Sequence, residues 1–276
     1  MKKITLLLVC VLVSSVSFGQ KKPKIKGDKN VTTVNNVLDA DFNAIEVNDG
    51  LEVVINQTGQ NSYSVTTDQN LQEIIQFNVT DSILKIYTLN KIVSKKKLEI
   101  NLNVKEVKHL ILKNDVQVSG QGQLKSSSVM YINAYNSSKI DLDVQADDVV
   151  VTLQRNAGGK LKADSRNTTI VMNDRTDLKA TVIAKKARVT LTKSAQLDLR
   201  GDADFAAFNL KGSSNLNSRK MKVSSVDLYT SNSSDVYVHA SKNLELYAQG
   251  KSKIYVYGDP KMEIKGLTDK SKIIKK

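Results

Sequence analysis

The sequence predicts an all-β protein, a parallel β-helix whose rungs are about 19 residues long. Three observations carry this prediction. Apolar and polar residues alternate with a period of two, short turn motifs separate the alternating runs, and both features recur at nearly constant spacing from about residue 105 onward. A steady period of this kind is typical of a solenoid, in which each repeat buries its apolar positions only by stacking against its neighbours.

The apolar positions of the repeat form two predicted columns of inward-facing side chains. The first column is expected to hold the pairs Leu110/Leu112, Met130/Ile132, Val151/Leu153, Ile170/Met172, Val189/Leu191, Phe208/Leu210, Val226/Leu228, Leu244/Leu246 and Met262/Ile264. The second column is expected to hold Ile140, Leu161, Leu178, Leu197, Leu216, Val236, Ile254 and Ile273. Turns rich in Asn, Ser and Gly, such as those at 232–234 and 250–252, separate the strands.

An antiparallel sandwich or barrel is the alternative fold, because its strands alternate in the same way. The hairpins of such folds favour two-residue Asn-Gly or Asp-Gly turns. The only such pair in the chain is Asp49-Gly50, which lies outside the regular repeats. The turn chemistry therefore favours the parallel β-helix.

The first 19 residues have the pattern of a signal peptide. Lys2 and Lys3 precede a short apolar run, and the small residues Ser17 and Gly19 suit a cleavage site before Gln20. The run is too short to anchor the chain in a bilayer. We therefore expect export to the periplasm, the outer surface or the medium. The only cysteine, Cys10, lies in this segment, so the mature chain is expected to have no thiol chemistry.

Three further regions follow the signal peptide. Residues 20–40 are polar and rich in lysine, and are expected to form a flexible basic leader. Residues 41–105 are expected to form a small mixed N-terminal cap and the first rungs, with one short helix over Asn70–Gln76. Residues 106–276 hold the regular repeats.

The chain is basic, with a formal net charge of +13. Its lysines cluster at 21–29, 95–97 and 270–276, where they are expected to be solvated and to protect the ends of the solenoid. The functional alternative is adhesion to anionic polysaccharide or lipid headgroups. Nucleic acid is not an expected partner, because no groove-docking motif appears and aromatic residues do not interleave with the basic runs.

The sequence offers little support for catalysis. A glycosidase needs a positioned pair of carboxyl groups, and the crowded Asp141 and Asp143 are candidates. We expect Asp141 to point outward in a column with Lys162, Lys179 and Asp198, which is typical of a solvated face. The two histidines, His109 and His239, have no ligand or triad partners at suitable spacing. No catalytic residues are predicted.

One column of carboxylates indicates a calcium site. The outward positions of the last repeats are Asn209, Asp227, Glu245 and Glu263. Neighbouring rungs of a parallel stack lie about 4.8 Å apart, so the last three would face one another. Carboxylate oxygens suit calcium, although solvated repulsion is the simpler interpretation. No other cofactor is predicted.

The last repeats also place tyrosines on the outer surface. Tyr229 and Tyr247 are expected to stack in one column, and Tyr237 and Tyr255 in the other. Lys211 and Lys265 are expected to flank the first pair. Exposed aromatic rings on successive rungs suit sugar rings, but stacked tyrosines also stabilise a β-helix without any ligand. A dimer contact is a third interpretation.

The chain resembles the head GIN domain family, whose members are named as autotransporter adhesins and are common in Bacteroidetes. The resemblance covers about residues 42–265. It rests on F-x-x-I-x-V-x-x-G-L-x-V-x-I-x-Q at 42–57, V-x-x-D-x-N-L at 65–71, and degenerate turn units such as S-S-K-I and G-G-K-L. Membership implies a right-handed β-helix, export and an adhesive role, with no catalytic residues to transfer. The membrane barrel implied by the autotransporter name is not expected in a chain that ends at S-K-I-I-K-K.

The leading functional prediction is an exported, adhesin-like protein that binds glycan or a cell-surface protein through an outer face. The alternatives are an envelope scaffold module that associates with itself and a polysaccharide-degrading β-helix enzyme. The sequence predicts no transmembrane anchor and leaves the oligomeric state open.

Overall fold

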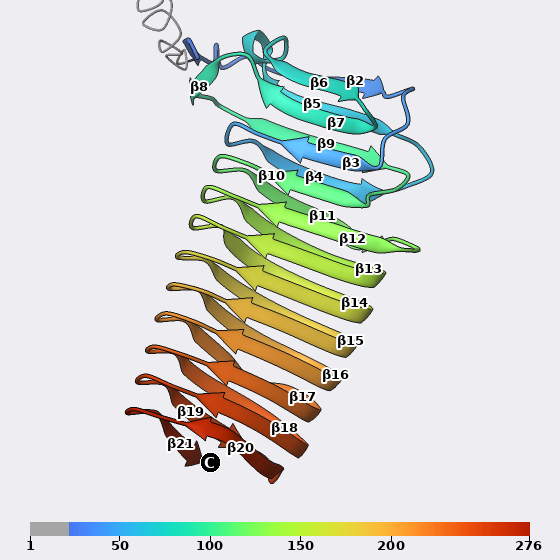
Figure 1. Cartoon of the computed structure of the whole chain (residues 1–276). Helices are drawn as coiled ribbons and strands as arrows, with labels where there is room; N and C mark the ends of the chain where they lie inside the picture. Colours follow the sequence, from blue (N-terminus) through green and yellow to red (C-terminus); the bar gives the residue numbers. More distant parts are fainter. Residues whose placement is uncertain (1–21) are drawn as a thin grey trace, which may run out of the picture.

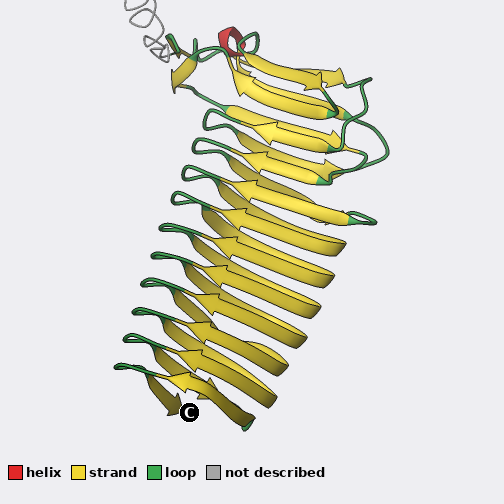
Figure 2. Cartoon of the chain, viewed as in Figure 1, coloured by secondary structure: helices red, strands yellow, loops and turns green. Residues whose placement is uncertain are grey.

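The computed structural model describes residues 22–276 and confirms a right-handed parallel β-helix (Figures 1 and 2). The signal peptide predicted at residues 1–19, with Cys10, lies outside the described residues. Six long strands form the regular rungs: β13 (Lys139–Leu153), β14 (Gly158–Met172), β15 (Asp177–Leu191), β16 (Gln196–Leu210), β17 (Asn215–Thr230) and β18 (Asp235–Ala248).

Each long strand bends halfway, so one rung contributes to two opposed faces. We call the face built by the first halves face A and the face built by the second halves face B. Face A also contains β4 (Glu52–Gln57), β9 (Leu98–Val104), β11 (Gln117–Lys125), β19 (Lys253–Tyr257) and β21 (Lys272–Lys275). Face B also contains β3 (Ala44–Val47), β7 (Ile83–Thr88), β10 (His109–Leu112), β12 (Val129–Ala134) and β20 (Lys261–Leu267).

The core lies between the two faces and is aliphatic. Residues of the predicted columns from Leu110 to Ile254 are buried, which confirms their inward orientation. Their alignment was wrong by two residues at five steps. Leu110 lies beside Ile132, Met130 beside Val149, Ile140 beside Gly159, Leu161 beside Ala180, and Phe208 beside Leu228.

Bulges account for the misplacement of Met130 and of Phe208. β11 holds two additional residues between Ser119 and Gln123, and β17 holds one additional residue opposite Asp198–Arg200. Each bulge lengthens one rung beyond its neighbours. Apolar side chains point inward on both sides of each bulge, since Val118, Leu124, Leu216 and Leu228 are all buried.

Tight turns join face B of one rung to face A of the next. They hold residues in the left-handed region, such as Asn136 at φ 52° and Asn232 at φ 67°. Asn reaches this region more readily than most residues because its side chain bonds the local backbone. The turns therefore stack along one edge of the solenoid, on the left of Figure 2.

The rungs at the N-terminal end do not follow sequence order. The rung of β7 and β9 lies outside the earlier rung of β3 and β4, which in turn pairs with β10 and β11. Antiparallel strands then close this end. β6 (Ile75–Thr80) pairs with β7, β5 (Ser62–Asp68) pairs with β9, and β2 (Val31–Val37) pairs with β5.

Two predictions for this end were wrong. The described part of the predicted flexible leader, residues 22–40, is structured, because it contains β2 and also β1 (Lys24–Lys26), which pairs with β8 (Lys91–Ser94). The buried carboxylate of Asp68 holds them by accepting hydrogen bonds from the backbone N–H groups of Lys29 and Lys96. The helix predicted over Asn70–Gln76 is only a 3₁₀ turn at Gln69–Leu71, since β6 begins at Ile75.

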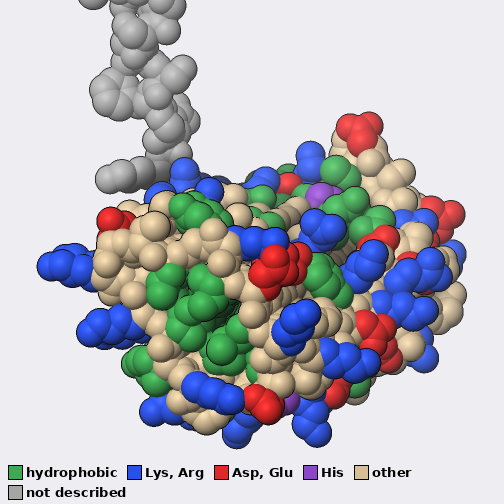
Figure 3. Space-filling model, turned by 60° about the horizontal axis from the view of Figure 1, so that its bottom comes forward, with side chains coloured by type: hydrophobic (Ala, Val, Ile, Leu, Met, Phe, Trp, Pro, Cys, Tyr) green, Lys and Arg blue, Asp and Glu red, His purple; other side chains and the backbone are tan. Residues whose placement is uncertain are grey.

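The C-terminal end of the core is open. Met262, Ile264 and Leu267 of β20 are 42%, 50% and 43% exposed, although the first two continue the inward columns. Figure 3, which brings this end forward, shows hydrophobic side chains gathered there among lysines. Across residues 22–276 no helix is long and apolar enough to cross a membrane.

Candidate functional site

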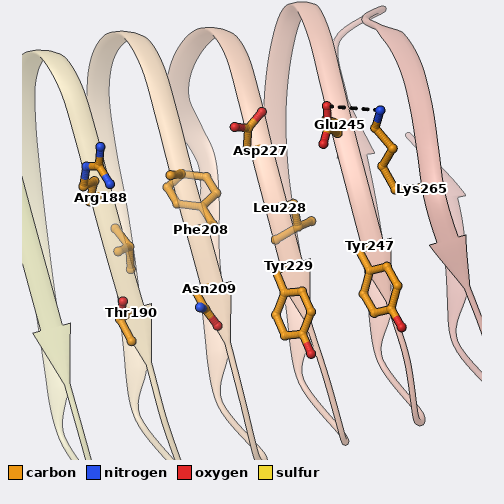
Figure 4. Close-up of a pocket in the computed structure, with 12 residues that line it drawn as sticks. Arg188, Thr190, Phe208, Asn209, Asp227, Leu228, Tyr229, Glu245, Tyr247 and Lys265 are labelled. Atoms are coloured by element: carbon orange, nitrogen blue, oxygen red, sulfur yellow. Dashed lines mark ion pairs between the residues drawn. The ribbon is translucent and has the colours of Figure 1, made fainter.

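The candidate site is a shallow groove on face B near the open end (Figure 4). Two outward columns border it. Arg188, Ala207, Asp227, Glu245 and Glu263 form one column, and Thr190, Asn209, Tyr229 and Tyr247 form the other. The alternation of β17 sets this arrangement, because Leu228 points into the core and turns its two neighbours outward.

Tyr229 and Tyr247 lie on adjacent rungs with parallel rings. Their planes differ by 2° and their centroids are 5.3 Å apart. Both side chains are half-buried, so part of each tyrosine is exposed at the surface of face B.

Neighbouring groups hold the two rings in place. Gln249 donates a hydrogen bond to the Tyr229 hydroxyl (3.3 Å) and accepts one from the Tyr247 hydroxyl (3.4 Å). The Lys211 ammonium lies 5.9 Å from the centre of the Tyr229 ring. On the other side, the Tyr247 ring packs against Gly266, where any side chain on residue 266 would collide with the ring. The tyrosine pair is thus a rigid surface.

Small side chains create a hollow beside this pair. The hollow has a volume of about 410 Å³ and extends from Arg188 to Lys265. Ala207 and Asn209 occupy the rung between the longer side chains of Arg188 and Tyr229, so the surface is recessed there. The Asn209 Oδ1 atom is buried and has no hydrogen-bond partner among the described residues.

Charges of both signs line the hollow. Lys265 donates to Glu263 (2.5 Å) and lies 3.8 Å from Glu245. The hydrogen bond from Lys265 lowers the pKa of Glu263, and the same bond, with the charge of Glu245, raises the pKa of Lys265. Within residues 22–276, Arg188 and Asp227 form no ion pair, which leaves one cation and one carboxylate available to a ligand.

The column contains the three predicted carboxylates in order, but the residue before them is Ala207 and not the predicted Asn209. Asp227, Glu245 and Glu263 do lie on adjacent rungs, but Asn209 belongs to the tyrosine column. Lys265 bonds two of the three carboxylates. In the described part of the chain, no group of three His, Cys, Asp or Glu side chains has the geometry to hold a metal ion. Calcium binding at this column stays a prediction.

Tyr237 and Tyr255 lie on face A, on the opposite side of the solenoid from the groove. Their rings are 4.5 Å apart and 7° from parallel, and the Lys276 ammonium is 5.8 Å from the Tyr255 ring. The four predicted tyrosines therefore form two separate surfaces. His239 and Tyr257 also pair on adjacent rungs of face A, which the sequence analysis missed.

The two predicted lysines also lie apart. Lys211 contacts the Tyr229 ring, but Asn209 is the residue beside Tyr229 on the preceding rung. A register shift between Leu246 and Tyr247 moves Lys265 out of the tyrosine column and toward the carboxylates. The sequence analysis missed Arg188, Asn209 and Gln249, because a small or polar side chain in a single repeat gives no periodic signal.

Asp141, Asp143 and His109 are engaged in structural contacts, whereas the buried Nδ1 atom of His239 has no hydrogen-bond partner among the described residues. Asp141 pairs with Lys160 (3.4 Å), whereas the Lys162 predicted as its neighbour pairs with Asp143 (3.9 Å). His109 bonds the Asn133 side chain, and partial burial lowers the pKa of His109. These contacts are typical of a solvated β-helix surface.

Comparisons with known proteins agree with the fold. A family model described as "Putative auto-transporter adhesin, head GIN domain" matches residues 41–164 and 152–260. A putative adhesin structure from Parabacteroides merdae shares 19% identity and a TM-score of 0.66, covering 92% of this chain and 99% of that one.

Two structures from Parabacteroides distasonis are similar as well. A putative adhesin has 19% identity and a TM-score of 0.63, with 92% of this chain and 97% of that one covered. A putative lipid binding protein has 21% identity and a TM-score of 0.61, with 91% and 99% covered. No curated protein sequence matches this chain.

Proposed function

Because this chain belongs to the family of putative auto-transporter adhesins with a head GIN domain, we propose that it is an exported, non-enzymatic adhesin-like protein. It binds glycan or a cell-surface protein through an outer face of the β-helix. The observation that carries this proposal is the pair of half-buried, parallel rings of Tyr229 and Tyr247 beside the hollow on face B.

The chemistry of the groove suits a sugar ring. The C–H face of a pyranose packs against the exposed part of a phenol ring, where an aromatic side chain can bury a large apolar area. Asp227 and Arg188 are available to bond hydroxyl groups on either side of the recessed rung. The unbonded Asn209 Oδ1 atom adds an acceptor at the floor of the hollow.

Export is part of the same proposal. Lys2 and Lys3, the apolar run that follows and the cleavage pattern before Gln20 support secretion. Adhesion requires a position outside the cytoplasm, so fractionation with surface proteolysis of intact cells tests this part directly. A protein confined to the periplasm would rule out an adhesive role.

The binding test compares two double variants. Tyr229→Ser with Tyr247→Ser removes the rings on face B, and Tyr237→Ser with Tyr255→Ser makes the same change on face A. We expect the face B variant to lose binding to a glycan array or to whole cells while it keeps its Tm. For neutral glycans, the face A variant serves as the matched control. A lower Tm with binding intact would leave these tyrosines a structural role only.

A structural module is the second candidate function, and the open C-terminal end favours it. Met262, Ile264 and Leu267 are apolar and exposed beside two unpaired strand edges. Such an edge can pair with another chain. A self-associating scaffold would show a molar mass that increases with concentration in light scattering, whereas a monomeric adhesin would not.

A further inference from the structure

A second hollow lies on face A, over β13 to β16, and its lining is strongly charged. Its volume is about 470 Å³. One outward column runs Asp141, Lys160, Lys179, Asp198, and the next runs Asp143, Lys162, Thr181, Arg200. Buried residues between the two columns, such as Leu161 and Ala180, form the floor.

The acidic residues of this hollow are all engaged with cations. Asp141 pairs with Lys160 and Asp143 with Lys162, while Asp198 accepts a bond from Arg200 (3.2 Å). Lys179 forms no ion pair with any residue from 22 to 276 and lies between Lys160 and Asp198 in its column. The hollow thus contains four cations and three carboxylates, with one positive charge uncompensated.

Thr181 marks the centre of the positive charge. Its short side chain lies between Lys162 and Arg200 on adjacent rungs, each about 4.8 Å away along the stack. Lys179 precedes it by two residues on the same strand, about 6.6 Å away, and points outward on the same face. The Lys162 ammonium pairs with Asp143 and the Arg200 guanidinium with Asp198, so Lys179 carries the charge that no carboxylate neutralises. The Thr181 hydroxyl on the same strand can donate to an oxyanion held by this charge.

We propose that the hollow around Thr181 binds a carboxylate or sulfate group of an acidic glycan. Lys162, Lys179 and Arg200 supply the charge, and the Thr181 hydroxyl donates a hydrogen bond. The proposal rests on the proposed function only for the class of ligand, because its residues lie on the face opposite Tyr229 and Tyr247.

The rest of face A favours a sugar polymer over other polyanions. The column that contains Lys179 continues through Asn217 to Tyr237 and Tyr255. An anion site and an aromatic pair therefore share one straight track, with Tyr237 about 14 Å from Lys179. A glycan chain combines spaced anionic groups with apolar ring faces, so it can use both.

The charge density is too low for nucleic acid. Affinity for DNA or RNA depends on neutralising many closely spaced phosphates. Asp141, Asp143 and Asp198 lie among the cations and would repel such a chain. The floor residues Leu161 and Ala180 are each 2% exposed, so they offer little apolar surface to an acyl chain.

The test uses polygalacturonate as the probe, with the neutral polymer dextran for comparison. Lys162→Gln with Lys179→Gln removes two charges from the hollow, and Thr181→Glu introduces a carboxylate at its centre. Lys185→Gln with Lys242→Gln removes the same charge from exposed lysines outside both hollows. Binding is measured by calorimetry at several salt concentrations.

We expect both hollow variants to lose affinity for polygalacturonate by about tenfold or more, and the control variant to stay within about twofold of the parent. Equal losses in the hollow and control variants would overturn the proposal, because they would indicate attraction by net charge alone. Tighter binding to a single-stranded oligonucleotide or to anionic phospholipid vesicles than to polygalacturonate would also overturn it.

The acidic-glycan site on face A and the binding site at the tyrosine pair on face B can be disproved separately. The variant with Tyr229→Ser and Tyr247→Ser is expected to keep its affinity for polygalacturonate, since its changes lie on face B. Loss of polygalacturonate binding in that variant alone would move the acidic ligand to face B and overturn the assignment to Thr181.

Discussion

Gly159 occupies an inward position where the neighbouring rung leaves no space for a side chain. A Cβ atom on this residue would lie 2.0 Å from the carbonyl oxygen of Ile140. Its φ of +132° is also a conformation that other residues rarely adopt. The close approach of the rungs of β13 and β14 therefore depends on the absence of a side chain at this position.

Replacing Gly159 with alanine is expected to destabilise the protein by several kcal/mol, because both a steric clash and backbone strain result. Gly59→Ala is the matched control, since its Cβ would have no neighbour within 4 Å and its φ is not positive. Thermal unfolding followed by circular dichroism measures the difference. An unchanged Tm in the Gly159 variant would show that the rungs separate at low cost.

Gly159 also explains one limit of the sequence analysis. The alternation rule locates inward positions from apolar side chains, and glycine has none. The analysis therefore chose Leu161, two residues later, for the second column, whereas Leu161 lies beside Leu142. The alternation rule likewise gives no signal for Asn209 and Ala207, whose small side chains create the hollow on face B.

At the scale of the single strand, the period of two fixes which face each residue joins. β17 contains a bulge and is the longest strand of the regular rungs, yet Leu228 is 3% exposed and its neighbours Asp227 and Tyr229 point outward. The bulge changed which residues are neighbours, and the apolar residues on both sides of it are still buried. Orientation was therefore predictable from sequence where alignment was not.

Leu228→Asp tests this orientation. The change buries a carboxylate with no partner, so we expect a loss of at least about 3 kcal/mol in the free energy of unfolding. Ser225→Asp places the same side chain at an outward position of the same strand and is expected to have little effect. Urea denaturation measures both. A Leu228 variant as stable as the parent would contradict the inward assignment.

The tyrosine pairs were predictable because the same residue type recurs at the spacing of one rung. Tyr229 and Tyr247 are one rung apart and carry the same side chain, so the repeat itself points to them. Arg188 and Gln249 had no such signal. They reach the groove through a register that depends on the bulge in β17 and on a turn, and neither feature follows from alternation.

At the scale of the whole molecule, the two ends differ. Antiparallel strands close the N-terminal end, where the rung of β7 and β9 lies outside an earlier part of the chain. Alternation alone cannot reveal this order, because a strand has the same pattern wherever it is inserted in the stack. The regular repeats from β13 to β18 do follow sequence order, and for them the sequence analysis predicted the architecture.

The open end at β20 and β21 implies that local unfolding of the solenoid begins there. Each rung is held mainly by its two neighbours, and the last rung has only one. We expect backbone amide hydrogens to exchange with deuterium fastest in β20 and β21, and progressively more slowly toward β13. Hydrogen exchange followed by mass spectrometry of peptides measures this gradient. Equal protection in β20 and β14 would contradict it and indicate that the solenoid opens only as one cooperative unit.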